Sequence, residues 1–246
     1  MKLTEAIMGT AISIEILDSP TEEIFNRVFD YFKYVDEKFS TYKETSEISK
    51  INRAELKLED ASQDMQLIFK LSELTKKQSK NYFDIHKPDG SIDPSGLVKG
   101  WSIHEASKIL DSADHKDYCI EAGGDVQVRK PYDSSEPWKI GIRNPFNLSE
   151  IVKVVHVKNE GVATSGTYER GQHIYNPFNP EQKLEDVASI TVIGPNIYEA
   201  DRFATSAFAM GLDGINFIEG LQGFEGYMID SKGIATFTSG FDKYLK

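Results

Sequence analysis

Hydrophobic and polar positions alternate near the start of the chain and then change to a helical spacing. The segment "TAISIEIL", residues 10–17, alternates with a period of two, which predicts a half-buried strand. Residues 19–40 carry apolar side chains at spacings of three and four. This spacing predicts an amphipathic helix, with Ser19 or Thr21 available as its N-cap.

The rest of the chain shows the same two periodicities in an irregular order. Helical spacing recurs in residues 61–80, 97–113 and 198–211. Strand patterns occupy residues 118–129, 138–144, 150–165 and 184–194, and a closing hairpin is expected over residues 226–238. Because helices and hairpin-linked strands do not alternate regularly, the pattern predicts an α+β fold with a mixed, largely antiparallel sheet flanked by helices. We expect one domain over residues 1–246, with room for two lobes and a ligand cleft between them.

Composition and charge narrow the classes of partner. The 246 residues include 39 acidic and 28 basic side chains, so the formal net charge is -11, which argues against nucleic acid as a partner. Cys119 is the only cysteine, which excludes an internal disulfide and a C-x-x-C metal site. No window approaches the roughly 18 consecutive apolar residues of a spanning helix, so we expect no stable membrane insertion. The start lacks a basic and then apolar leader, so we expect no signal peptide and a cytoplasmic protein.

The stretch "DPSGLVKGW", residues 93–101, joins a turn to the start of a predicted helix. Backbone N–H groups at a helix start, together with the cation of Lys99, suit a phosphate or pyrophosphate group. The alternative is an ordinary loop with two glycines and a surface lysine, because the pattern is neither a Walker loop nor a complete dinucleotide fingerprint.

The stretch "EAGGDV", residues 121–126, places Gly123 and Gly124 inside a strand pattern. Paired glycines at such a position permit a bulge or the close approach of a flat ligand to the backbone. Both interpretations stay open from the sequence.

The stretch "ATSGTYERGQHIYNP", residues 163–177, gathers hydroxyls and a histidine between two strands. His173 suits a general base because an unperturbed histidine titrates near pH 6.5, and Thr164 and Ser165 offer hydroxyls to a ligand. The alternative is a structural histidine. Acyl transfer is not favoured, since "TSG" lacks the G-x-S-x-G elbow.

The stretch "ADRFATSAFAMG", residues 200–211, carries an acid and a hydroxyl four residues apart. Four residues are just over one helical turn, so Asp201 and Thr205 project from the same helix face and suit one cation between them. A carboxylate, a hydroxyl and nearby carbonyl oxygens are hard ligands that suit Mg²⁺. The alternative is an acid near a helix start that is favoured by the helix dipole, with Thr205 only capping or packing.

Eight stretches in register along nearly the whole chain carry a resemblance to one family. They are "MGTAISIEI", "FSTYKETSEISKIN", "DPSGLVKGW", "EAGGDV", "WKIGIRNP", "VATSGTYER", "HIYNP" and "ADRFATSAFAMG". Through these stretches the chain resembles the FAD:protein FMN transferases, the ApbE-type flavin transferases.

The resemblance implies an enzyme that binds FAD, uses Mg²⁺ and moves FMN onto a threonine or serine hydroxyl of an acceptor flavoprotein, with release of AMP. Asp201 and Thr205 match the family's metal-binding acid and hydroxyl, and a backbone carbonyl near Val98 would be a third ligand. His173 matches the histidine associated with catalysis. Asp125 would serve as the base if His173 only positions the phosphate.

The resemblance also places further residues around the dinucleotide. These residues are Met8, Ser40, Tyr42, Glu121, Gly123, Gly124, Asp125 and Thr164. Lys99, Ser165 and His173 complete the predicted FAD-binding set. The chain departs from the family in "DPSGLVKG", where many members have a glycine pair after the aspartate. It departs again at Glu121, where an asparagine is frequent, which leaves the flavin-ring contacts open.

Two other functions fit the same residues. A Mg²⁺-dependent FAD pyrophosphatase would use water in place of the acceptor hydroxyl and release FMN and AMP. A non-catalytic flavin-binding protein would leave FAD intact, but it would not require Asp201, Thr205 and His173 together.

Overall fold

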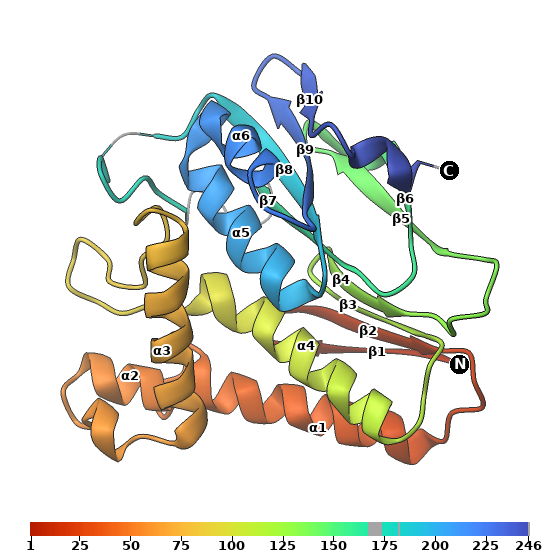
Figure 1. Cartoon of the computed structure of the whole chain (residues 1–246). Helices are drawn as coiled ribbons and strands as arrows, with labels where there is room; N and C mark the ends of the chain where they lie inside the picture. Colours follow the sequence, from red (N-terminus) through yellow and green to blue (C-terminus); the bar gives the residue numbers. More distant parts are fainter. Residues whose placement is uncertain (167–173, 182, 246) are drawn as a thin grey trace.

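The described residues build one large antiparallel sheet with helices on one of its faces. The computed structural model describes residues 1–166, 174–181 and 183–245. The strands of the large sheet are β1 (Lys2–Ile7), β2 (Thr10–Ile16), β3 (Tyr118–Ala122), β4 (Asp125–Arg129), β7 (Gly161–Gly166), β8 (Val187–Gly194), β9 (Glu225–Asp230) and β10 (Ala235–Phe237). They lie in the order β1-β2-β3-β4-β7-β8-β9-β10, and each neighbouring pair is antiparallel (Figure 1). Strands β5 (Trp138–Asn144) and β6 (Asn147–Val157) form a separate two-stranded sheet.

Helices cover one face of the large sheet. They are α1 (Glu22–Phe39), α2 (Glu47–Asn52), α3 (Gln63–Gln78), α4 (Ser95–Ser112), α5 (Ile197–Ala209) and α6 (Gly214–Glu219), with short 3₁₀ turns at Leu58–Asp60 and Gly211–Asp213. A third 3₁₀ turn, Phe241–Tyr244, packs on the opposite face, in the cluster that also contains residues of β5 and β6. Within the described ranges, no helix combines the length and the apolar character needed to cross a membrane.

Three apolar clusters hold these layers together. The largest lies between the sheet and α1, α4 and α5, where Phe25, Phe29 and Phe32 of α1 are almost completely buried. A second cluster fills the space among α1, α3 and α4. The third lies on the opposite face, between the large sheet and the β5–β6 hairpin. The hairpin is also anchored at its start, because Trp138 Nε1 donates a hydrogen bond to the Arg129 carbonyl at the end of β4 (3.1 Å).

The predicted α+β fold with a largely antiparallel sheet flanked by helices is confirmed. The expected helices form within a few residues of their predicted bounds. The strands do so as well, except that residues 118–129 and 150–165 each form two strands joined by a turn in place of one. The segment before residue 10 adds a strand, because residues 2–16 fold into the β1–β2 hairpin, with Met8 and Gly9 at its turn in left-handed conformations (φ 56° and 71°). The glycine pair is also a hairpin turn and not a bulge. Ala122 pairs with Asp125, and Gly123 and Gly124 both have positive φ, as a two-residue turn of this kind requires.

The start of α5 is fixed against the sheet by close backbone packing. The Ile197 N–H donates to Gln127 Oε1 in β4 (2.8 Å), and Asn196 caps the helix by accepting from the Glu199 N–H (3.0 Å). A Cβ atom at Gly161, the first residue of β7, would lie 2.1 Å from the Ile197 nitrogen. Only glycine at this position lets α5 lie where it does.

We therefore expect Gly161→Ala to destabilise the protein, because the added methyl group meets backbone that cannot rotate away. Overpacking of this kind costs about 1–3 kcal/mol or more, which corresponds to a fall in Tm of roughly 2–4 °C per kcal/mol for a chain of this size. Thermal unfolding followed by circular dichroism measures the effect. Gly220→Ala is the matched control, since its added Cβ would find its nearest atom at an ordinary 3.5 Å. Equal Tm values for the two variants would contradict the packing argument.

Candidate functional site

Two glycines of α4, four residues apart, let this helix approach α5 closely. A Cβ atom at Gly100 would lie 2.6 Å from Asp201 Cβ, and one at Gly96 would lie 3.2 Å from Thr205 Cγ2. Residues four apart lie on the same helix face, so both glycines face α5. Their lack of side chains allows the contact between the two helices.

Asp201 and Thr205 both lie at this contact, on the same face of α5, as their spacing predicts. Asp201 is 3% exposed, and its Oδ2 accepts a hydrogen bond from the Gly100 N–H (2.8 Å). Thr205 is half-buried, and its Oγ1 donates to the Gly96 carbonyl (3.4 Å). A carboxylate, a hydroxyl and a backbone carbonyl therefore gather between α4 and α5, and these are the oxygen ligands that Mg²⁺ prefers.

A buried ion pair lies beside this contact. Asp125, the first residue of β4, is fully buried, and its Oδ1 accepts from the Thr164 N–H of β7 (3.1 Å). Its Oδ2 lies 2.7 Å from Lys99 Nζ on α4. Among the described residues this oxygen receives no hydrogen bond of regular geometry, so the contact with Lys99 is an ion pair by distance. The pair links the helix layer to the sheet.

The two carboxyl groups and the lysine determine the charge state of the site. Burial and, next, the negative charge of Asp125 raise the pKa of Asp201 to about 7, while Lys99 and the Gly100 N–H act in the opposite direction. A carboxyl with this pKa holds its proton over part of the neutral range. A cation beside Asp201 would favour the ionised form.

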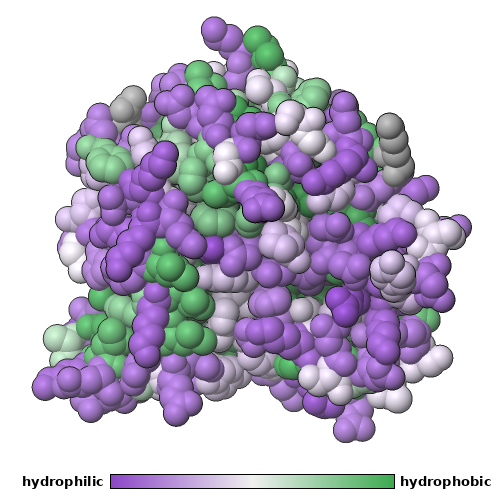
Figure 2. All heavy atoms as spheres, in the orientation of Figure 1, coloured by the Kyte–Doolittle hydropathy of each residue, from purple (hydrophilic) through white to green (hydrophobic). Residues whose placement is uncertain are grey.

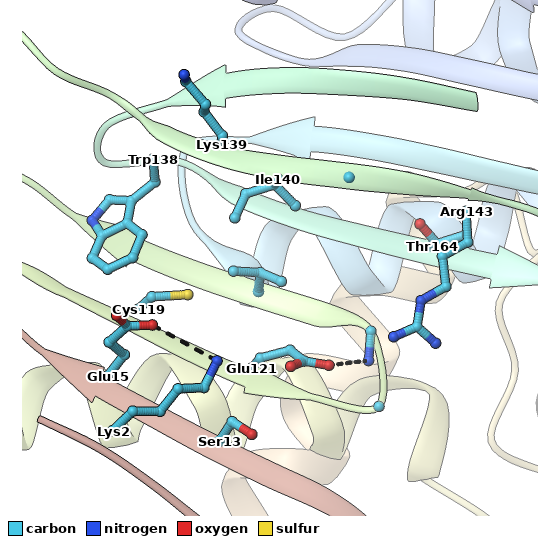
Figure 3. Close-up of a pocket in the computed structure, with 14 residues that line it drawn as sticks. Lys2, Ser13, Glu15, Cys119, Glu121, Trp138, Lys139, Ile140, Arg143 and Thr164 are labelled. Carbon is cyan, nitrogen blue, oxygen red and sulfur yellow. Dashed lines mark hydrogen bonds and ion pairs between the residues drawn. The ribbon is translucent and has the colours of Figure 1, made fainter. Parts of the chain in front are cut away.

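Two cavities lie near this buried pair. The helix-side cavity has a volume of about 340 Å³ and is lined by Met8, Gly9, Val35, Asp36, Phe39, Ser40, Thr41, Tyr42, Lys43, Ser95, Val98 and Lys99. The hairpin-side cavity has a volume of about 260 Å³ and is lined by Lys2, Ser13, Glu15, Cys119, Glu121, Gly123, Gly124, Val126, Trp138, Lys139, Ile140, Gly141, Arg143 and Thr164 (Figure 3). Asp125 contacts Lys99, which lines the first cavity, and Thr164, which lines the second. The buried pair therefore lies between the two cavities.

The predicted FAD-binding residues divide between these cavities. Met8, Ser40, Tyr42 and Lys99 line the helix-side cavity, and Tyr42 is almost fully exposed. Glu121, Gly123, Gly124 and Thr164 line the hairpin-side cavity, where Glu121 accepts a long hydrogen bond from the Gly124 N–H (3.4 Å). Asp125 and Ser165 are buried.

A smaller cavity of about 50 Å³ adjoins the helix-side cavity. Ser95 lines both, and Gly96 and Thr205 line the smaller one together with Tyr175 and Pro177. The hydroxyl proposed for the cation thus faces the segment that follows His173. His173 itself lies in residues 167–173, outside the described residues.

Val98 lies in the first turn of α4, and its side chain is buried. This helix begins at Ser95, two residues before its predicted start. The carbonyl that Thr205 approaches is that of Gly96. The sequence did hold a signal for this contact, because Gly96 and Gly100 have the i, i+4 spacing of one helix face.

Two features of the site were missed at the sequence level. The ion pair between Lys99 and Asp125 joins residues on different elements, and no local pattern predicts it. Trp138 and Arg143 line the hairpin-side cavity although they were read only as part of a strand.

Curated proteins named FAD:protein FMN transferase are similar to this chain. The one from Haemophilus influenzae is 28% identical over 136 residues, which covers 51% of this chain and 39% of the relative. The one from Escherichia coli strain K12 is 24% identical over 163 residues, which covers 63% of this chain and 46% of the relative. The chain thus spans less than half the length of these relatives.

Solved structures of similar fold extend over the whole chain. The flavin transferase ApbE from Vibrio cholerae superposes with a TM-score of 0.86 at 20% identity, covering 100% of this chain and 99% of that one. The ApbE protein from Thermotoga maritima gives a TM-score of 0.87 at 20% identity with the same coverage. At this identity the likeness establishes the fold. The ApbE family model matches residues 8–88 and 85–228, most of the sequence, and the chain therefore belongs to the ApbE family.

Proposed function

We propose that the protein is an FAD:protein FMN transferase, which moves FMN from FAD to a threonine or serine hydroxyl of an acceptor flavoprotein and releases AMP. The observation that carries this proposal is the position of the Lys99–Asp125 pair. It lies between two cavities and beside Asp201 and Thr205, whose side-chain oxygens are candidate ligands for a cation. Membership of the ApbE family and the name of its curated relatives support the same reaction.

The two cavities suit the two ends of one long ligand. Pockets for small molecules are roughly 300–1,000 Å³, so volumes of about 340 and 260 Å³ leave either cavity small for a whole dinucleotide. The Met8–Gly9 and Gly123–Gly124 turns are at the same end of the sheet, because Ile12 pairs with Ala122. FAD would lie across these turns, with its phosphates near Lys99, and would enter the hairpin-side cavity only at its Gly123–Gly124 end, so that the β5 side of this cavity would stay open.

Mg²⁺ is the cation that this site fits, with Asp201, Thr205 and the Gly96 carbonyl as candidate ligands. When bound, it would neutralise charge on the phosphates and stabilise the leaving AMP. Lys99 lines the helix-side cavity and brings a positive charge to the same region. Asp125 holds Lys99 in position through its ion pair and is itself held by the Thr164 N–H.

The burial of Asp125 favours His173 as the general base. A base must reach the acceptor hydroxyl to within about 3 Å or through one water, and a carboxyl that is fully buried and paired with Lys99 is poorly placed for this. We therefore assign proton removal from the acceptor hydroxyl to His173 and the positioning of Lys99 to Asp125.

The direct test is incubation of the protein with FAD, Mg²⁺ and a pooled library of threonine-containing peptides, followed by mass spectrometry. We expect FMN covalently attached to peptide and AMP in solution. Asp201→Ala should lower the rate by about 10²-fold or more, because it removes the carboxylate ligand of the proposed cation. Asp242→Ala, an exposed acid of the last 3₁₀ turn, is the control and should leave the rate unchanged.

Each other outcome identifies a different function. Free FMN and AMP without a peptide adduct, also when whole candidate acceptor proteins are supplied, would favour an FAD pyrophosphatase. Intact FAD in every sample would leave a flavin-binding protein without turnover.

The charge state of Asp201 gives a pH-dependent prediction. Its pKa is about 7 in the folded protein against 3.8 ordinarily, so the folded state binds the proton more tightly and loses stability as the pH rises through this interval. Asp201→Asn keeps an oxygen for the Gly100 N–H but does not ionise. In the presence of a chelator, the variant should therefore gain Tm relative to wild type between pH 5 and pH 8, by roughly 2–4 °C for each kcal/mol removed.

Thermal unfolding at several pH values, with and without Mg²⁺, measures this difference. Mg²⁺ should raise the Tm of wild type at pH 8 more than that of Asp201→Asn. Parallel pH profiles for the two proteins would show that Asp201 does not carry the shifted pKa.

A further inference from the structure

Strand β5 has one edge that is not paired. It pairs with β6 on one side, and the two strands form a sheet of their own. Within the described ranges, no backbone hydrogen bond joins residues 138–144 to any other segment. The N–H and C=O groups along the second edge of β5 are therefore available to another strand.

This free edge faces the hairpin-side cavity. Consecutive residues of β5, from Trp138 to Gly141, line the cavity together with Arg143. Since neighbouring side chains of a strand point to opposite faces, a cavity that touches both sets lies along the strand's edge. Figure 3 shows β5 running along one side of the cavity, with β2 and β3 on the other.

The cavity leads toward the proposed reaction centre. Trp138 and Cys119 lie at one end, and Arg143, Thr164 and the glycine turn lie at the other, where the Arg143 guanidinium points toward the turn (Figure 3). The Thr164 N–H donates to Asp125 at this second end. A segment bound along β5 would therefore reach the site where the flavin phosphates are proposed to lie.

The charges along β5 favour an acidic segment. Lys139 and Arg143 are exposed cations, and the structure assigns neither of them an ion pair with a described residue. The two acids that line the cavity do have partners. Glu15 forms an ion pair with Lys2 (3.7 Å), and Glu121 accepts a hydrogen bond from the Gly124 N–H. The same two cations would repel the β5 edge of a second copy of the chain, which argues against self-pairing.

We propose that the free edge of β5 binds an extended, acidic segment of the acceptor protein as an added strand, which brings its hydroxyl residue to the reaction centre. This inference rests on the proposed function. Strand addition takes its affinity from backbone hydrogen bonds and its specificity from alternate side chains. Alternate residues of the segment would face Lys139 and Arg143, and the others would face the polar side chains of β2 and β3.

The first experiment selects peptides by binding alone, without FAD. A pooled library of nine-residue peptides, with a central threonine and randomised flanks, is passed over the immobilised whole chain, and mass spectrometry identifies the retained peptides. We expect enrichment of acidic peptides. The double substitution Lys139→Glu/Arg143→Glu should lower their retention by about tenfold or more, with the fold intact by circular dichroism.

The matched control reverses two lysines on another surface. Lys70→Glu/Lys77→Glu makes the same change in charge on α3, beside an apolar patch that includes Phe69 and Leu74. Figure 2 shows apolar surface over α3, toward the lower left of the view. Retention should stay at the wild-type level in this variant, because the patch is remote in sequence and structure from β5.

The second experiment tests the geometry of strand addition. Peptides from the enriched set are prepared with N-methyl groups on odd or on even positions. Only alternate N–H groups of an edge strand face its partner, so one of the two sets should lose binding and the other should keep it.

Several results would overturn the proposal. They are equal retention by the Lys139→Glu/Arg143→Glu variant, equal binding of both N-methylated sets, and binding of inorganic phosphate in place of any peptide. A dimer in analytical ultracentrifugation that Lys139→Glu/Arg143→Glu abolishes would assign the edge to a second copy. If the Lys139→Glu/Arg143→Glu variant transfers flavin at the wild-type rate, the proposed binding of the acceptor along β5 is wrong, but the proposed transferase activity stands. If acidic peptides bind as expected but receive no FMN, only the proposed transferase activity is refuted.

Discussion

The contact between Gly100 and Asp201 is the constraint on which the rest of the site depends. The two helices approach so closely that a single methyl group at Gly100 would meet both the Cβ and the carboxylate of Asp201. This approach places the carboxylate on the Gly100 N–H and Thr205 beside the Gly96 carbonyl. It also places Lys99, the residue before Gly100, within reach of Asp125 in the sheet. The close packing of α4 on α5 thus brings Lys99 and Asp201 together beside Asp125.

The electrostatic balance of the site is local and does not follow from the charge of the chain. The protein carries a net charge of -11, yet two buried carboxyls share one lysine between α4 and β4. Such a cluster is short of positive charge, and the raised pKa of Asp201 is the result. A bound cation would remove that shortage. This would account for a buried acid with an elevated pKa beside a hydroxyl and a backbone carbonyl. A cluster selected for stability alone would be better served by apolar side chains.

Periodicity predicted most of the fold, because the helices and strands of this chain have one apolar and one polar face. The spacing of Asp201 and Thr205 correctly placed them on one face of a helix. Local patterns were ambiguous for short turns. The Gly123–Gly124 pair was read as a bulge or as a close approach to a ligand, and the structure shows a hairpin turn in place of the bulge. The start of α4 was placed two residues too late, because Ser95 and Gly96 follow a proline and are typical of a loop. The Lys99–Asp125 pair was beyond sequence reasoning altogether, since it depends on how α4 lies against the sheet. The resemblance to a family supplied the residues expected around FAD, but not their division between two cavities.

The arrangement of the two cavities explains why the β5–β6 hairpin remains a separate sheet. The helix layer closes one face of the large sheet, while the hairpin covers only part of the other face and leaves β2 and β3 beside an open groove. An unpaired strand edge is a liability in a soluble fold, and proteins usually cover it or place charges on it. Here the edge carries Lys139 and Arg143, which discourage pairing with a like-charged copy and leave the backbone open to an acidic partner. The proposed transfer of FMN to another protein needs one opening for a chain and one for FAD. The groove along β5 would be the opening for the chain, at the end of the sheet where the Lys99–Asp125 pair marks the proposed FAD site.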